Sequence, residues 1–97
     1  MQTLYTWDEE KARLNLRKHG VSFASAQEVF EDPNQVVTPN YFIDGEQRYQ
    51  IIGMTRQAVL LLVVFVDDSN PDIEIVHIIS ARKGESVEEE AYENQIS

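Results

Sequence analysis

Two arginines and one glutamate are the residues of this sequence whose types best suit chemistry on a phosphate group. Arg48 falls early in a predicted strand and Arg82 at the end of another. An arginine can bind a phosphate through two parallel hydrogen bonds, and Glu46 could accept a proton as a general base. The alternative is structural, because such arginines also pair with acids, here Glu46 or Glu74. For Glu46 itself, a salt bridge to Arg48 is the preferred interpretation.

The two histidines are the other groups that could carry protons near neutral pH. His19 ends the first predicted helix, where it could instead interact with the negative end of the helix dipole and cap free carbonyls. His77 shares a strand face with Ile73, Ile75 and Ile79, which favours a partly buried structural histidine. His19 is therefore a candidate proton carrier with a structural role as the preferred alternative, and His77 is interpreted as structural.

The net charge of −9 argues against binding to nucleic acid, but the charge is unevenly distributed. Residues 84–97 hold five acids and no base, whereas every lysine and arginine lies before residue 84. The cations that could follow an RNA backbone are Lys11, Arg13, Arg17 and Lys18 on one helix face, with Lys83 at a strand end. The alternative for the helix is an ordinary solvated face, on which Glu10 pairs with Arg13.

Several classes of protein and site are disfavoured by what the sequence lacks. It has no cysteine, only two histidines and scattered acids, so we expect no metal site and no other cofactor. The longest apolar run, residues 58–66, has the length of a strand and is shorter than the roughly 20 residues that span a bilayer. Because the first residues also lack a signal-peptide pattern, we expect a cytoplasmic protein that does not bind membranes.

Capping residues predict two helices in the first third of the chain. Asp8 is a good N-cap for a helix that ends before Gly20, a residue suited to the left-handed stop position. Ser22 caps a second helix over about residues 23–31, and Pro33 prevents its continuation.

After residue 33 the pattern changes to strands. Residues 58–66 are apolar throughout, which predicts a central strand, and a loop is predicted over residues 40–46. The other predicted strands are 35–38, 47–54 and 71–81, while residues 4–7 form either an edge strand or an extended lead-in. With a last helix over about 87–96, the chain is predicted to be one α+β domain over residues 1–97: two N-terminal helices, an antiparallel four-stranded sheet and a C-terminal helix.

The last predicted helix has two separate apolar faces. Val87 and Ala91 lie on one, and Tyr92 and Ile96 lie on the other. One small core cannot cover both faces. We therefore expect a partner protein or a second copy of the chain to bind Tyr92 and Ile96.

Several segments, taken together, resemble the BrnT toxins of bacterial type II toxin–antitoxin systems. They follow in the family's order and span nearly the whole chain. The segments are Y-T-W-D-E at 5–9 with Lys11 and Asn15, K-H-G-V-S-F at 18–23, V-F-E-D-P at 29–33, G-E-Q-R at 45–48 with I-G at 52–53, I-I-S-A-R-K at 78–83, and Y-E at 92–93.

This resemblance implies a RelE-like fold, an endoribonuclease activity that blocks translation, and neutralisation by a BrnA-like ribbon-helix-helix antitoxin. It also implies that operator DNA is bound only through the antitoxin, in a dimer or heterotetramer. Metal-free RNA cleavage needs a base, an acid and cations that stabilise the phosphorane. On this interpretation Arg48 and Arg82 bind phosphate, and Glu46 or His19 carries protons.

The sequence departs from the family's pattern after S-A-R. The family is often basic there, whereas residues 84–90 of this chain are G-E-S-V-E-E-E. The alternative function is therefore a family member that has lost cleavage and keeps only partner binding. An adjacent short reading frame that encodes a ribbon-helix-helix protein would favour the toxin over the binding module.

Overall fold

A mixed five-stranded sheet forms the centre of the fold in the computed structural model, which describes residues 2–96 except for the side chain of Ile96. The strand order is β1-β5-β4-β3-β2. The strands are β1 (Thr3–Thr6), β2 (Val36–Ile43), β3 (Glu46–Met54), β4 (Leu60–Asp67) and β5 (Glu74–Lys83). The apolar strand β4 lies at the centre, as the sequence predicts.

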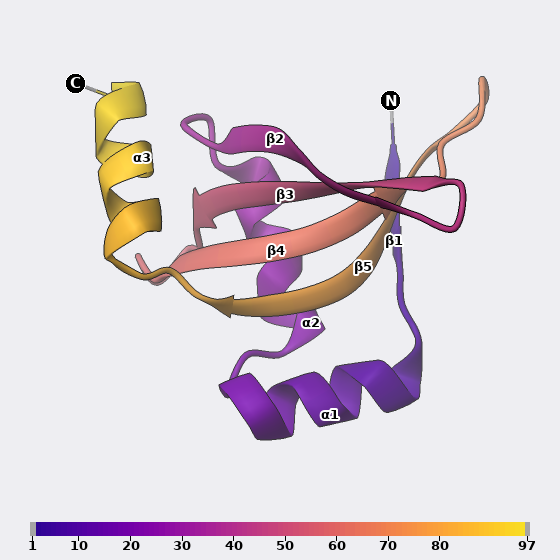
Figure 1. The fold of residues 1–97 in the computed structure, drawn as a ribbon, viewed down its shortest axis with the longest axis horizontal. Coiled ribbons are helices and arrows are strands. Elements are labelled where there is room, and N and C mark those ends of the chain that lie inside the picture. Colours follow the sequence, from indigo (N-terminus) through magenta and orange to yellow (C-terminus); the bar gives the residue numbers. More distant parts are fainter. Residues whose placement is uncertain (1, 97) are drawn as a thin grey trace.

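The predicted sheet of four antiparallel strands is correct for β2 to β5 but incomplete. β1 adds a fifth strand at the free edge of β5 and runs parallel to it, with Leu4 opposite Ile75. The sequence left open whether residues 4–7 are an edge strand or a lead-in. From β1 the chain enters the helices and returns to the sheet at its opposite edge, in β2 (Figure 1).

The predicted loop over residues 40–46 is wrong. β2 continues to Ile43 and joins β3 through a two-residue turn of Asp44 and Gly45, whose φ angles are 50° and 77°. Two consecutive positive φ angles are typical of a type I′ hairpin turn, for which Asp-Gly is a favoured pair. The sequence therefore carried the signal for a hairpin at this position.

Four helical segments surround the sheet: α1 (Glu9–His19), α2 (Phe23–Ala26), the 3₁₀ helix η1 (Gln27–Glu31) and α3 (Ser86–Ile96). Asp8 caps α1 by accepting a hydrogen bond from the Lys11 amide at 3.0 Å, and Gly20 ends it with a φ of 70°. The predicted helix over 23–31 tightens after one turn. Phe23, Ala26 and Val29 are buried at a spacing of three residues, which matches the 3₁₀ repeat.

The helices leave part of one sheet face uncovered. α2 and η1 cover one face, where Val29 packs so closely that a Cβ on Gly53 would lie 3.0 Å from the Val29 Cβ. α3 packs on the other face, but only at one end of the sheet, where Tyr92 contacts Ile52 and Leu62 (Figure 1). We call the remainder of this second face the open face.

The residues Tyr92 and Ile96 were predicted to contact a partner. Tyr92 is instead buried in the chain's own core, and its hydroxyl donates to Asp32 Oδ2 at 2.6 Å. Such a contact across 60 positions in the sequence leaves no local signal. The side chain of Ile96 lies outside the described residues, and Val87 is the large apolar residue that α3 exposes, with 74% of its surface accessible.

α1 lies along the edge of β5, beyond the end of β1 (Figure 1). Asn15 takes the place of a strand partner there: its amide donates to Ala81 O at 2.8 Å and accepts from Ala81 N at 3.1 Å. The same amide group donates to Val21 O at 3.0 Å. This buried side chain therefore fixes the position of α1 against the sheet. No helix within residues 2–96 is long and apolar enough to cross a membrane.

Candidate functional site

A row of side chains crosses the open face from one strand to the next. His77 on β5 is paired with Val66 on β4 and with Thr6 on β1. The Thr6 hydroxyl and His77 Nδ1 are 2.8 Å apart, so a hydrogen bond fixes the imidazole ring. His77 is half-buried, which agrees with its interpretation from the sequence as a partly buried structural histidine. Its neighbours on other strands could not be predicted, because the alternation along one strand does not show which residues lie beside it.

Arg48 continues this row on β3. The β3–β4 register pairs Tyr49 with Phe65, so the next position toward the hairpin turn brings Arg48 beside Val66. Arg48 and His77 therefore lie on the same face, two strands apart, which corresponds to roughly 10 Å between their backbones.

Arg48 has an unsatisfied donor. The guanidinium Nε is buried and makes no hydrogen bond with any described residue. The salt bridge to Glu46, the preferred alternative from the sequence, is not among the ion pairs of the described residues. Glu46 lies on the same face two residues earlier and is exposed. Because buried polar groups are almost always satisfied, the free Nε suits an anionic ligand.

Arg82 lies on the same face as His77 because of a β-bulge. Val64 is paired with Ser80 and Phe65 with Ile78, so β5 contains one extra residue between them. Without that residue, His77 and Arg82, which are five positions apart, would point to opposite faces of the sheet. Arg82 is nevertheless roughly 15 Å further along the strand from His77.

The guanidinium of Arg82 is held by α3. Its Nη1 donates to Glu88 Oε1 at 2.8 Å and to Lys83 O at 3.1 Å, and it lies 3.5 Å from Glu85 Oε1. The hydrogen bond between Arg82 and Glu88 raises the pKa of the arginine and lowers that of the carboxyl group. The alternative predicted from the sequence, an ion-paired arginine, is thus correct in kind, although the partners are Glu88 on α3 and Glu85 directly before it.

The four cations of α1 do not form one face. Asn15 points to β5, and Ala12 and Leu16 border a hollow with α2. At 100° per residue, Lys11 and Lys18 lie on the opposite flank, the one nearer to the open face.

The remaining predicted cations point elsewhere. Arg13 and Arg17 lie on the solvent side of α1, and Arg13 forms an ion pair with Glu10, as the alternative interpretation of this helix predicts. Lys83 is paired with Leu61 and so lies on the face covered by α2. His19 is half-buried one turn after Asn15, on the inward flank of α1, and the structure does not bring it to Arg48.

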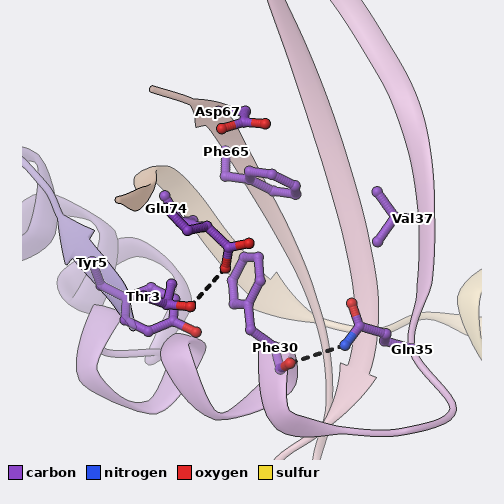
Figure 2. A pocket seen from close by; sticks show the side chains of 9 residues that line it. Thr3, Tyr5, Phe30, Gln35, Val37, Phe65, Asp67 and Glu74 are labelled. Atoms are coloured by element: carbon purple, nitrogen blue, oxygen red, sulfur yellow. Dashed lines mark hydrogen bonds between the residues drawn. The ribbon is translucent and has the colours of Figure 1, made fainter. Parts of the chain in front are cut away.

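A cavity of about 350 Å³ lies on the sheet face of Phe65, which the strand register places opposite to that of Arg48. Figure 2 shows the side chains that line it. Its walls include the rings of Phe30 and Phe65, with the carboxylates of Asp67 and Glu74 near its mouth. Burial raises the pKa of the Tyr5 hydroxyl in this cavity, and the negative charge of nearby acids, Glu74 among them, raises it further. These negative charges disfavour a phosphate, so the open face is the better anion site.

Comparison with known proteins identifies the family. A model of the ribonuclease toxin BrnT of type II toxin–antitoxin systems matches residues 7–88. The chain belongs to the BrnT toxin family. The crystal structure of the Brucella abortus ribonuclease toxin BrnT is similar, with 25% identity and a TM-score of 0.66 over 89% of this chain and 100% of that one. A comparison with curated protein sequences gives no match.

Family membership confirms the resemblance on which the functional interpretation of the sequence rests. The matched region includes Arg48 and Arg82, and the shared fold is an α+β arrangement of helices around a mixed sheet. As a toxin-family member of a type II toxin–antitoxin system, a BrnT-type chain is expected to have an antitoxin as its partner.

Proposed function

We propose that this chain is a metal-independent endoribonuclease that binds RNA on the open face, inhibits translation in the cytoplasm and is neutralised by a ribbon-helix-helix antitoxin. The observation that carries the proposal is the buried, unpartnered Nε of Arg48 on an uncovered sheet face of a ribonuclease-toxin family member. The antitoxin complex, a dimer or heterotetramer, binds operator DNA through the antitoxin.

The chemistry requires an RNA 2′-oxygen to attack the adjacent phosphorus while the 5′-oxygen leaves. Arg48 stabilises the negative charge of the phosphorane, and Glu46, exposed on the same face, accepts the 2′-hydroxyl proton. The 5′-oxygen receives a proton from a second group. His77 is better placed for this role than His19, because it lies in the same row as Arg48.

Flanking phosphates are bound on the same side of the sheet, toward α1 and toward the end that α3 covers. Arg82 and the flank of α1 that carries Lys11 and Lys18 supply the cations. Local charge dominates over the net charge of −9, because the screening length at physiological salt is about 8 Å.

The ion pairs of Arg82 favour a second function. Glu88 and Glu85 occupy the Nη1 side of Arg82, which reduces its capacity to bind phosphate. With Arg82 occupied in this way, the chain would bind an antitoxin without cleaving RNA. The two functions differ in whether the purified chain cleaves RNA.

Expression of the chain without an antitoxin is the test. We expect growth arrest, cleavage of RNA by the purified protein in the presence of EDTA, and recovery of growth when Arg82 is replaced by alanine. Because Arg82→Ala leaves Glu88 without its cation, the thermal midpoint of the variant is measured beside Arg82→Lys. Normal growth with the wild-type chain, together with intact RNA in vitro, would favour the binding module.

A further inference from the structure

The edge strand β2 contains a bulge directly opposite Arg48. The register between β2 and β3 runs up to Pro39 and resumes at Phe42, which leaves Asn40 and Tyr41 together opposite Arg48. A bulge of this kind redirects a side chain and is common beside functional sites. Here the register places Tyr41, together with Asn40, across from Arg48, the proposed phosphate ligand.

Side-chain hydrogen bonds hold the bulge in place. Asn40 Oδ1 accepts from the Tyr41 amide at 2.7 Å, and Asn40 Nδ2 donates to Gln50 Oε1 at 2.9 Å. Gln47 Nε2 donates to the Asn40 carbonyl at 3.0 Å. The backbone of Tyr41 is therefore fixed by contacts that do not involve its ring.

The Tyr41 ring itself has little contact with the rest of the chain. The Tyr41 side chain is 74% exposed, although burial of an aromatic ring would stabilise the fold. An exposed aromatic ring beside a cation is the combination that proteins use to bind single-stranded nucleic acid, with a base on the ring and a phosphate on the cation.

We propose that Tyr41 stacks on one base of a single-stranded RNA whose adjacent phosphate is bound by Arg48. The proposal rests on the proposed ribonuclease function and adds a residue that positions the substrate. A stacked base would hold the RNA chain across β2 and β3, so that the scissile phosphate lies over the row formed by Arg48 and His77.

A protein strand is a poorer occupant of this position. Strand addition to the edge of β2 needs a regular series of free amides and carbonyls. Pro39 lacks an amide hydrogen, and the bulge at Asn40 and Tyr41 interrupts the spacing of the edge. The next exposed ring, Phe42, is 68% exposed but follows the bulge on the face away from Arg48, so it provides a matched control.

The affinity for a 2′-O-methyl single-stranded RNA, which lacks the attacking hydroxyl, tests the proposal without cleavage. Tyr41→Ala should weaken binding about 5- to 100-fold, the range for loss of one stacked base. Tyr41→Trp should preserve binding, and Phe42→Ala should leave it unchanged. Thermal midpoints equal to that of the wild type establish that all three variants are folded.

Two further readouts separate stacking from charge. In the first, the fluorescent base 2-aminopurine replaces each base of the RNA in turn. At one position the wild-type chain and Tyr41→Trp should quench its fluorescence, whereas Tyr41→Ala should not quench it at any position. The slope of log affinity against log salt should fall by about one in Arg48→Ala and stay unchanged in Tyr41→Ala. Equal loss in Tyr41→Ala and Phe42→Ala would overturn the proposal, as would unchanged binding by Tyr41→Ala.

The proposed function and this inference fail differently. If the wild-type chain binds no RNA, the ribonuclease function fails and the inference fails with it. If the wild-type chain binds and cleaves RNA while Tyr41→Ala does both equally well, only the inference is overturned. The inference alone is also overturned if Tyr41→Ala loses affinity for the antitoxin but not for RNA.

Discussion

Replacing Arg48 with alanine is expected to reduce the rate of RNA cleavage by about two to three orders of magnitude. Removal of one preorganised donor to a developing oxyanion has an effect of this size. The Nε of Arg48 is buried and unpaired, so turning the guanidinium toward a phosphorane breaks no hydrogen bond of this atom. Single-turnover cleavage of a short RNA measures the effect directly.

A charge-matched control separates this effect from a general loss of positive charge. Arg56 is exposed and forms an ion pair with Glu31 at 2.8 Å beside η1, away from the open face. Arg56→Ala removes the same charge and should cleave RNA within about twofold of the wild-type rate. Arg48→Lys keeps the charge but cannot form the bidentate hydrogen bonds of a guanidinium, so it should recover only part of the cleavage rate. Equal rates for Arg48→Ala and the wild type would remove Arg48 from the mechanism.

Replacing Asp32 with alanine is expected to destabilise the fold by roughly 2–4 kcal/mol, because it leaves the buried Tyr92 hydroxyl and the half-buried Met54 amide without an acceptor. The carboxylate accepts hydrogen bonds from Tyr92 Oη at 2.6 Å, Met54 N at 2.7 Å and Asn34 N at 2.8 Å. It therefore joins α3 to the end of η1 and to β3. Urea unfolding measures the loss, with the exposed Asp72→Ala as control, for which no change above about 0.5 kcal/mol is expected.

The same carboxylate makes stability depend on pH. Burial alone would raise the pKa of Asp32, but the hydrogen bonds from Tyr92, Met54 and Asn34 outweigh it, and the pKa lies below its ordinary value. The stability that Asp32 contributes is therefore complete above the unfolded-state pKa of about 3.9 and is lost as the pH falls through the lowered pKa. Asp32→Asn should unfold with a weaker dependence on pH in this range. A dependence identical to that of the wild type would show that other acids cause it.

Local signals explain which parts of the fold could be predicted. The ends of α1 follow from Asp8 and Gly20, each of which satisfies or redirects the backbone at its own position. β4 follows from an apolar run that only a strand covered on both faces can bury. In both cases the necessary information lies within a few neighbouring residues.

Long-range pairing explains what could not be predicted. The burial of Tyr92 depends on Asp32, and the inclusion of β1 depends on a free edge of β5. The candidate site has the same limitation. Arg48 was identified by its residue type, but its neighbours His77 and Tyr41 follow from the registers of separate strand pairs.

Mapping a bound RNA onto the protein distinguishes the open face from the rest of the molecule. Backbone amide shifts are recorded while the 2′-O-methyl RNA is titrated into the labelled chain. Binding on the open face predicts the largest changes at Arg48, His77 and Thr6, with smaller changes at Lys11 and Lys18. Changes concentrated around Phe30, Asp67 and Glu74, which line the cavity on the opposite face, would contradict it.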